Sequence, residues 1–397
     1  MKKCVVLGVT GSIAAYKAAE LVSRLKKRDI DVRVIMTEAA TKFVAPLTFE
    51  TLSLNPAVTD MFSRETPWEV EHIALAKRAD VFVVAPASAN FIGKFAAGIA
   101  DDMLTTTVMA CPCKKIVSPA MNHNMFHNPI VQDNIEKLKH YGYEIVEPAH
   151  GMLANGDMGD GRMPDEELLF EYIVKEIAFE KDMTGKKVLV TAGATVEAID
   201  PVRFITNHSS GKMGFALAKN AMLRGADVTL VMGKCDSEPP VFANTVKVQS
   251  AKDMYDAVIE RADSMDIIVK AAAVADYRPK NVSSEKVKKQ DGNMSIELER
   301  TDDILKTLGE RKNGQFICGF SMETENMLEN SRKKLAKKNL DMVVANNLKV
   351  AGAGFETDTN IVTMITDTEV LELPIMNKEE VAFHIIDQIL SMQNTDR

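Results

Sequence analysis

The chain has 397 residues, 46% of them hydrophobic and 26% charged, which is the composition of a globular protein with two or three domains. The formal net charge of −8 argues against a broad nucleic-acid-binding surface, and no apolar run is long enough to span a bilayer. The five scattered cysteines form no disulfide framework, so we expect a cytoplasmic protein that binds neither nucleic acid nor a membrane.

The first apolar run, residues 5–8, predicts a buried strand, because glycines and polar residues after it interrupt any signal-peptide pattern. A helix is predicted at 13–25. Backbone N–H groups at the start of that helix could hold a phosphate, with hydroxyl donors from Thr10 and Ser12. The spacing fits neither GxGxxG nor a Walker loop, so a purely structural turn stays an equal alternative.

Small and polar residues follow three later predicted strands of the first half. These strand ends are Thr37–Ala40, Ala85–Asn90 and Ser118–Met125. In an open parallel sheet, ligands bind at the carboxyl ends of the strands. Strands that alternate with helices therefore predict a doubly wound α/β domain with a ligand site at this edge.

Three histidines of the first half each have a structural and a functional interpretation. His72 stands alone before an apolar helical pattern, where a structural histidine is more common than a catalytic one. His123 and His127 are four residues apart, as zinc ligands can be, but the glutamate of HExxH is missing and no third ligand is evident. We therefore predict no metal bound by protein side chains in this half.

Residues 150–163 hold four glycines in a short polar segment. This pattern predicts a mobile loop that could act as a lid, with a solvated connector as the alternative. A helix predicted at 166–177 closes the first half. Residues 180–185 are then the expected linker to the second half.

The ordered segments GVTGSIAAYK, MTEAATKF, the His72 segment, PASAN with GIADDMLT, PAMN and GMLANGDMGDGRM resemble the flavin-dependent cysteine decarboxylases. The resemblance implies a flavodoxin-like, doubly wound domain that binds FMN between the subunits of a trimer and converts 4′-phosphopantothenoylcysteine to 4′-phosphopantetheine. It implies catalytic roles for His72 and for Asn122, whose amide would bind the substrate carboxylate. The FMN ligands that it implies are Gly8, Thr10, Gly11, Ser12, Thr37, Ser88 and Met121.

One lid residue departs from the family pattern. Members that complete the reaction have a cysteine between Leu-Ala and Gly-Asp, and its thiol protonates the enethiol while reduced flavin returns hydride. This chain has Asn155 there, and a carboxamide is no acid at neutral pH. Full conversion to 4′-phosphopantetheine therefore has an alternative, in which the reaction stops at the aminoenethiol or this half only binds flavin; a redundant proton donor stays open.

The second half opens with KKVLVTAGATVEAIDPVRFITNHSSGKMG at 186–214, which predicts a buried strand, a glycine turn and a helix start. Strand, turn and helix N-terminus form a phosphate-binding unit. A Walker A loop would need glycine at 206 and Ser or Thr at 213, where the chain has Thr206 and Met213. An ordinary ATPase is therefore disfavoured.

Two further segments of the second half suit a nucleotide. The strand predicted at 267–270 ends in a run of alanines and Asp276, which gives room for a base and a carboxylate for its hydroxyl or amine donors. Residues 278–292 carry four lysines. They form either a solvated loop or a cationic clamp that closes over a triphosphate.

The segments TAGATVEAIDPVRFITNHSSGKMG, AAAVADY, EKVKK, GFSMETEN and DMVVANN resemble phosphopantothenate–cysteine ligase, with Gly-Ala-Thr at 193–195 in place of the usual Gly-Pro-Thr. The resemblance implies activation of 4′-phosphopantothenate by CTP as an acyl-cytidylate, with Mg²⁺ on the phosphates, and then attack by cysteine. It implies catalytic roles for Asn207, Arg203 and the loop residue Lys286. The residues implied to bind CTP are Ala273, Asp276, Lys286, Phe320, Lys338, Ser210, Gly211, Met213 and Gly214.

Together these patterns predict two doubly wound, Rossmann-like domains in series, a decarboxylase at 1–179 and a ligase at 186–397. The resemblance implies a bifunctional enzyme of coenzyme A biosynthesis with FMN as cofactor, Mg²⁺, and CTP as co-substrate. The partners that the resemblance implies are small-molecule substrates and further copies of the chain. Trimers of the first half combined with dimers of the second half would form a dodecamer. The alternative outside the enzymes is a flavoprotein regulator without catalytic activity. The predicted nucleotide-binding residues and the lysine loop of the second half disfavour this alternative.

Overall fold

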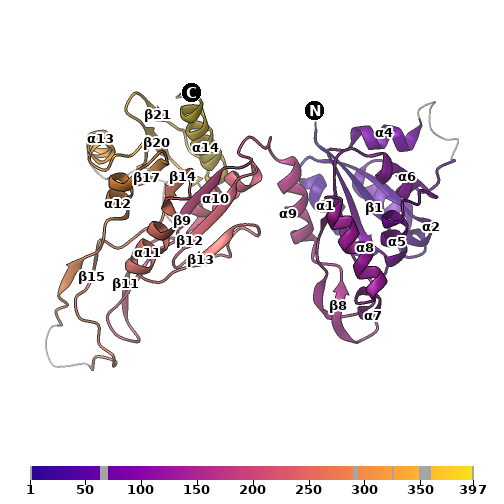
Figure 1. Cartoon of the computed structure of the whole chain (residues 1–397), viewed down its shortest axis with the longest axis horizontal. Coiled ribbons are helices and arrows are strands. Elements are labelled where there is room, and N and C mark those ends of the chain that lie inside the picture. Colours follow the sequence, from indigo (N-terminus) through magenta and orange to yellow (C-terminus); the bar gives the residue numbers. More distant parts are fainter. Residues whose placement is uncertain (1, 63–69, 289–293, 324–325, 348–358, 396–397) are drawn as a thin grey trace. The chain divides into compact units, whose positions relative to one another are not determined.

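The computed structural model describes residues 2–62, 70–288, 294–323, 326–347 and 359–395 (Figure 1). The chain divides into two compact units, Met1–Phe179 and Glu180–Arg397, and each is built around its own sheet. Parts of the predicted lysine loop and of the GFSMETEN segment fall outside the described residues. Within the described part of the chain, no helix is both long and apolar enough to cross a membrane.

The first unit holds a six-stranded parallel sheet in the order β3-β2-β1-β4-β5-β6. Its strands are β1 (Cys4–Val9), β2 (Asp31–Met36), β3 (Ala57–Val58), β4 (Val81–Ala87), β5 (Lys114–Pro119) and β6 (Glu144–Ile145). This is the strand order of a Rossmann fold, so the doubly wound prediction is confirmed. The flavodoxin-like order has five strands and lacks the edge strand that β3 adds here. The apolar run of β1 is buried over its whole length because both faces of the sheet are covered.

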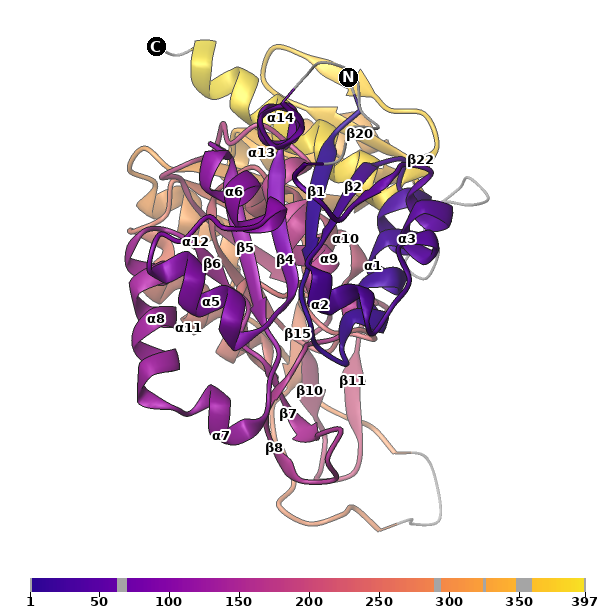
Figure 2. The same cartoon turned by 90° about the vertical axis from the view of Figure 1, so that its right-hand side faces the viewer.

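Helices lie on both sides of this sheet, with α5 and α8 on one side and α1 and α3 on the other (Figure 2). They are α1 (Ala15–Lys27), α2 (Glu38–Thr41), α3 (Pro46–Ser53), α4 (Glu71–Arg78), α5 (Ala89–Ala96), α6 (Met103–Ala110), α7 (His123–Phe126), α8 (Pro129–His140) and α9 (Glu166–Ile177). Alternate residues of β1 enter different hydrophobic cores. Val5 and Leu7 pack in the core that includes α1 and α9, whereas Val6 packs in the core that includes α5 and α6.

The glycine-rich segment 150–163 is a hairpin rather than an irregular loop, so the loop prediction is corrected. β7 (Ala149–Met152) pairs antiparallel with β8 (Met158–Arg162), and residues 153–157 form the tip. Glycine disfavours strands, but here the two arms satisfy each other's backbone hydrogen bonds. We call this element the lid hairpin; β8 lies beside α7 (Figures 1 and 2).

The second unit holds an eight-stranded sheet in the order β13-β12-β9-β14-β17-β18-β20-β21. Its strands are β9 (Lys187–Ala192), β12 (Asp227–Met232), β13 (Asn244–Lys247), β14 (Ile267–Lys270), β17 (Phe316–Glu323), β18 (Met342–Asn347), β20 (Val362–Ile365) and β21 (Val370–Glu372). The first six run parallel in the Rossmann order, and β20 and β21 extend the sheet antiparallel. The antiparallel pair of β20 and β21 therefore forms one edge of this sheet.

Helices and short hairpins complete the second unit. The helices are α10 (Lys212–Leu223), α11 (Ala251–Ala262), α12 (Ile304–Arg311), α13 (Met327–Lys337) and α14 (Lys378–Thr395). The short pairs are β10 (Val196–Ala198) with β11 (Phe204–Thr206), β15 (Tyr277–Pro279) with β16 (Leu298–Arg300), and β19 (Thr359–Asn360) with β22 (Met376–Asn377). Residues 180–185, the expected linker, pack onto this unit: Met183 is fully buried, and Arg224 donates to Asp182 at 2.9 Å.

Candidate functional site

A pocket of about 570 Å³ lies at the carboxyl edge of the first sheet, between the β1–α1 turn, the β5–α7 turn and the lid hairpin. Four of the predicted residues line it: Ser12, Met121, Asn122 and Asn155. Its wall also includes the side chains of Ile13, Tyr16, Met152 and Met163. A largely apolar wall with a few polar groups suits a flat aromatic ring.

The hydroxyl groups predicted at this edge have internal partners. Thr10 is 1% exposed, and its Oγ1 donates to the Pro86 carbonyl and accepts from the Ser88 N–H, both at 2.8 Å. Thr37 Oγ1 caps α2 by accepting from the Ala40 N–H, and Ser88 Oγ caps α5. These three residues therefore shape the edge of the sheet through main-chain contacts.

Gly8 and Gly11 lie at the same edge and allow close packing. A Cβ on Gly8 would lie 2.4 Å from Leu104 Cδ1, and a Cβ on Gly11 would lie 2.5 Å from Ala39 Cβ. Like Thr10, Thr37 and Ser88, neither glycine is among the described residues that line the pocket. Of the seven predicted FMN ligands, only Ser12 and Met121 are therefore in its wall.

Asn122 stands where β5 turns into α7. Its Oδ1 accepts from the Asn124 N–H at 2.9 Å and so caps the helix. This hydrogen bond occupies the oxygen of the side-chain amide, so the N–H₂ group is the part of the amide that can donate to a ligand. The Met121 N–H donates to the Gly161 carbonyl at 3.0 Å, which fastens the same turn to the lid hairpin.

Asn155 lies exposed at the tip of the lid hairpin. Its Nδ2 donates to Asp157 Oδ2 at 2.6 Å, and its Oδ1 accepts from the Asp157 N–H at 3.3 Å. The amide therefore holds the tip and offers no acidic proton to the pocket. Among the described residues of the pocket wall, none is a cysteine.

His72 is placed apart from this pocket. It lies half-buried in the first turn of α4, a few residues after segment 63–69, which is outside the described part of the chain. Within one chain, His72 is not among the described residues that line the pocket with Asn122 and Asn155. Its catalytic role at a site shared between subunits therefore stays a prediction.

Lys17 and Arg162 are two cations of the pocket wall that the sequence patterns did not reveal. Lys17 is 8% exposed; its Nζ donates to the Met163 carbonyl at 3.2 Å and lies 3.1 Å from Asp165 Oδ1. Arg162 Nη2 lies 3.5 Å from the same carboxylate oxygen. The sequence signal that could have revealed Lys17 is its place among alanines on a predicted helix. A lysine buried there needs a polar partner for its ammonium group, and such a partner marks a polar site.

A second pocket, of about 530 Å³, lies at the carboxyl edge of the second sheet. Most of the predicted ligase residues line it: Asn207, Ser210, Gly211, Met213, Gly214, Ala273, Asp276 and Phe320. They come from the loop before α10, the first turn of α10, the loop after β14, and β17. Residues distant in sequence thus meet at the strand ends, as the parallel-sheet argument predicts.

Two buried threonines hold this edge together. Thr191 Oγ1 and Thr195 Oγ1 each accept a main-chain N–H from segment 272–275, both at 3.0 Å. Asn207 Nδ2 donates to the Ala273 carbonyl at 3.4 Å, so it joins the same wall. The loops after β9 and β14 are therefore bonded to each other, which fixes the place of Asn207 at the pocket.

Lysines gather where this pocket meets a neighbouring one of about 380 Å³; Lys270, Asp276 and Lys334 line both. Lys338 lines the smaller pocket, where its Nζ lies 2.7 Å from Asp303 Oδ2. Burial, with Lys334 and Lys338 nearby, lowers the pKa of Lys270 to about 8. Ammonium groups concentrated in one place suit a ligand with several negative charges.

Arg203 and Lys286 are not among the described lining residues of either pocket. Arg203 Nε donates to Asp200 Oδ2 at 3.0 Å, and its Nη2 donates to the Val287 carbonyl at 2.7 Å. The Val287 N–H donates to the same Asp200 oxygen at 3.1 Å, and the Arg203 guanidinium holds the pKa of Asp200 well below its usual range. Arg203 therefore fastens the segment that carries the exposed Lys286.

The two units define a class of protein: a two-domain α/β protein in which each Rossmann-type sheet carries a pocket at its carboxyl edge. The flavoprotein family model matches residues 1–178. The model of the DNA/pantothenate metabolism flavoprotein C-terminal domain matches residues 183–392. The chain thus pairs a flavoprotein domain with a second domain of pantothenate metabolism.

Two relatives match nearly the whole chain. The coenzyme A biosynthesis bifunctional protein CoaBC of Bacillus subtilis (strain 168) is 49% identical over 399 residues, covering 99% of this chain and 98% of the relative. The protein of that name from Escherichia coli (strain K12) is 39% identical over 393 residues, covering 98% and 97%. The chain therefore belongs to the family of bifunctional coenzyme A biosynthesis proteins, and it is an enzyme with a decarboxylase half and a ligase half.

Two solved structures each match one half of the chain. The C-terminal domain of a coenzyme A biosynthesis bifunctional protein CoaBC is 48% identical, covering 54% of this chain and 98% of that domain, with a TM-score of 0.47. The FMN binding protein AtHal3 is 30% identical, covering 44% of this chain and 95% of that protein, with a TM-score of 0.39.

The substitution Gly161→Ala should loosen the lid hairpin far more than Gly156→Ala. Both glycines have a positive φ, +124° and +88°, so alanine is strained at each by about 1–2 kcal/mol. Only at Gly161 would the new Cβ collide with backbone, 2.2 Å from the Met121 carbonyl oxygen. Hydrogen exchange of the amides at 149–162 should therefore be faster in Gly161→Ala. Equal exchange in the two variants would show that the Met121 contact does not anchor the hairpin.

Proposed function

We propose that the ligase half joins cysteine to 4′-phosphopantothenate after CTP has activated the carboxylate as an acyl-cytidylate. Activation is needed because a carboxylate is a poor electrophile with no good leaving group. The observation that supports this proposal most strongly is the pocket that brings together Asn207, the start of α10 and Asp276. It offers an amide donor, helix N–H groups and a carboxylate within one cavity.

Each of these groups has a suitable partner in the proposed reaction. The N–H groups at Ser210–Gly214 point along the start of α10 and bind CTP phosphates. Asp276, with Ala273 and Phe320, receives the nucleoside and accepts from its hydroxyl or amine donors. Asn207 donates to the acyl-cytidylate. Mg²⁺ would be held mainly by the substrate phosphates and would offset their negative charge.

Arg203 and Lys286 act from outside the pocket wall. We assign Arg203 as a positioning residue, because its guanidinium joins Asp200 to the backbone of Val287. Lys286, the neighbouring residue, then offsets the negative charge that develops on the transferring phosphate. Lys338 adds charge from the smaller pocket.

A pyrophosphate-release assay tests the ligase proposal. Release should need CTP and 4′-phosphopantothenate, and Asn207→Ala should lower its rate by about 100-fold or more, because one well-placed donor is worth that much to a developing charge. Asn244→Ala, an exposed asparagine outside the pocket, should leave the rate unchanged. Full activity of Asn207→Ala, or equal activity with ATP, would exclude the proposed site.

CTP affinity should fall as the pH rises through 8, because Lys270 has a pKa lowered to about 8. Below that pH the lysine is charged and attracts the triphosphate. Above it, binding must take up a proton, which weakens the affinity by up to about tenfold per pH unit. Titration calorimetry of Mg²⁺–CTP should show this slope in the wild type and in Lys306→Met, but not in Lys270→Met. A slope that persists in Lys270→Met would assign it to another group.

In the first half we propose FMN-dependent decarboxylation of 4′-phosphopantothenoylcysteine. The pocket fits a flavin because apolar side chains and the β1–α1 turn meet there at the carboxyl edge of a parallel sheet. Bound FMN supplies the two-electron oxidation of the thiol-bearing carbon that makes loss of CO₂ feasible. The Asn122 N–H₂ group holds the substrate carboxylate, and His72 acts beside the reacting carbon from a neighbouring subunit. Lys17 and Arg162 add positive charge for the phosphates.

We propose further that the product of this half is the aminoenethiol. The observation in favour is the pairing of Asn155 with Asp157 at the position of the missing acid. A half that only binds flavin is the alternative. Anaerobic single turnover separates them, because decarboxylation bleaches the visible band of the oxidised flavin and yields CO₂, whereas mere binding does neither.

The proposed assembly is a cytoplasmic dodecamer that combines trimers of the flavin half with dimers of the ligase half. The cysteines of the chain are all free thiols, which fits a reducing compartment. A trimer would also let His72 of one copy reach the pocket of the next. Native mass spectrometry should find dodecamers, and a monomer with full decarboxylase activity would contradict a shared site.

A further inference from the structure

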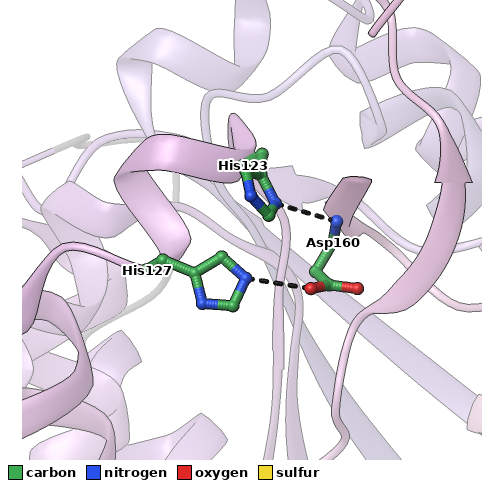
Figure 3. A group of neighbouring side chains, drawn as sticks. All are labelled: His123, His127 and Asp160. Carbon is green, nitrogen blue, oxygen red and sulfur yellow. Dashed lines mark hydrogen bonds and ion pairs between the residues drawn. The ribbon is translucent and has the colours of Figure 1, made fainter. Parts of the chain in front are cut away.

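Three side chains converge between α7 and the lid hairpin (Figure 3). His123 and His127 come from α7 and its C-terminal end, and Asp160 comes from β8. One nitrogen of each histidine and one oxygen of the carboxylate all lie within 4.8 Å of one another. The sequence spacing shows only the two histidines, because the third group arrives through the pairing of β7 with β8.

We propose that this cluster is a binding site for a divalent transition metal, with Zn²⁺ as the best match. Two imidazole nitrogens and one carboxylate oxygen are a ligand set that zinc accepts in tetrahedral geometry. Mg²⁺ and Ca²⁺ prefer sites made of oxygen alone. Three protein ligands leave one position for water.

The nitrogens that face Asp160 can bind a metal. His123 Nδ1 accepts from the Asp160 main-chain N–H at 3.1 Å, so this nitrogen is unprotonated, and a metal would displace that N–H to bind its lone pair. His127 Nε2 lies 2.9 Å from Asp160 Oδ2, and a metal ion bound between these two atoms would take the place of the hydrogen in this contact. Metal binding at such a site therefore releases a proton.

Neighbouring groups hold the three ligands in place. His150 Nδ1 lies 2.9 Å from Asp160 Oδ1, which leaves Oδ2 directed at His127. A Cβ on Gly159 would lie 2.8 Å from the His123 ring, so the β8 backbone packs directly against that ring. Outer contacts of this kind orient metal ligands.

A metal at this place would clamp the lid hairpin to α7. Asn122 caps that helix, and Gly161, the residue after Asp160, binds the Met121 N–H. Asn122 and Gly161, which adjoin the two sides of the clamp, both line the first pocket. Bound Zn²⁺ holds the hairpin over the pocket and slows the passage of substrate and product. That effect on turnover rests on the proposed decarboxylase function, whereas metal binding itself does not.

Zinc titration of the full-length, tag-free and metal-stripped protein tests the site, with a fluorescent chelator as competitor. Loss of even an outer-shell partner lowers metal affinity about 10–100-fold, so Asp160→Asn and His127→Gln should each weaken binding by at least about tenfold. His140→Gln, an exposed histidine on α8, is the matched control and should bind as the wild type does. Co²⁺ in place of zinc should give ligand-field bands without thiolate charge transfer, which distinguishes the cluster from the Cys111 and Cys113 thiols.

Hydrogen exchange tests the clamp. Zn²⁺ should slow exchange at 149–162 in the wild type and leave Asp160→Asn unchanged. Equal Zn²⁺ affinity of these two proteins, or thiolate bands with Co²⁺, would overturn the site, and binding without slower exchange would overturn the clamp. A protein that binds zinc as expected but releases no CO₂ would instead refute the proposed decarboxylase function and leave the metal site standing.

Discussion

Asn155→Cys should convert the aminoenethiol product of the first half into 4′-phosphopantetheine. A thiol at the hairpin tip supplies the acid that the carboxamide lacks, and the nearby Asp157 carboxylate keeps that thiol protonated. General acid catalysis contributes about 10²–10⁴-fold, so the reduced product of one anaerobic turnover should rise by about 100-fold or more. Mass analysis of the product and recovery of the oxidised flavin band measure the two parts of this change.

Asn155→Ser is the matched control for that experiment. Serine resembles cysteine in size but its hydroxyl is no acid near neutral pH, so this variant should still stop at the aminoenethiol. Formation of 4′-phosphopantetheine by the unmodified chain would show that another group already donates the proton. Identical products from the serine and cysteine variants would show that the hairpin tip does not reach the reacting carbon.

Arg203→Ala should lower the turnover number of the ligase by about 100-fold while changing CTP affinity little. The guanidinium holds the backbone of Val287 and so sets the place of Lys286, and displacement of a catalytic group by about 1 Å can cost about 100-fold in rate. Asp200, whose side chain is fully enclosed, also loses its ion partner, so the second unit should unfold at a lower temperature. Steady-state kinetics, equilibrium CTP binding and thermal unfolding measure the three effects.

Two further variants separate position from charge. Arg203→Lys keeps a cation but cannot reach Asp200 and Val287 together, so it should restore only part of the rate. Lys286→Ala should reproduce the kinetic loss without the thermal one, because Lys286 is exposed. Full turnover in Arg203→Ala would remove the positioning role assigned to it.

The fold was predictable where a local pattern determines an element. The apolar runs at 5–8 and 267–270 are buried strands, and the helix predicted at 166–177 is α9 with the same bounds. The lid hairpin was missed because its glycine content disfavours strands until a partner arm pairs with it. The pair β15–β16 was missed for a related reason: its arms are separated by a long polar segment, and each has three residues.

The candidate site divides in the same way. Asn122 and Asn207, which the resemblance singled out, line the two pockets, and their roles stay predictions. The resemblance could not tell which polar groups have partners within the protein. Thr10, for example, uses its hydroxyl to bond the ends of β1 and β4 to each other. The contact of Asp160 with His127 is equally invisible in the sequence, because it depends on the three-dimensional pairing of distant segments.

Mass spectrometry of one anaerobic incubation with 4′-phosphopantothenate, CTP, Mg²⁺ and cysteine tests most directly whether the two halves act in sequence. We expect pyrophosphate, 4′-phosphopantothenoylcysteine, CO₂, and a final product that is lighter than 4′-phosphopantetheine by two hydrogen atoms. Omission of CTP should abolish every one of them. Products that form without CTP, or 4′-phosphopantothenoylcysteine that accumulates with no loss of CO₂, would contradict the proposed sequence of ligation and decarboxylation.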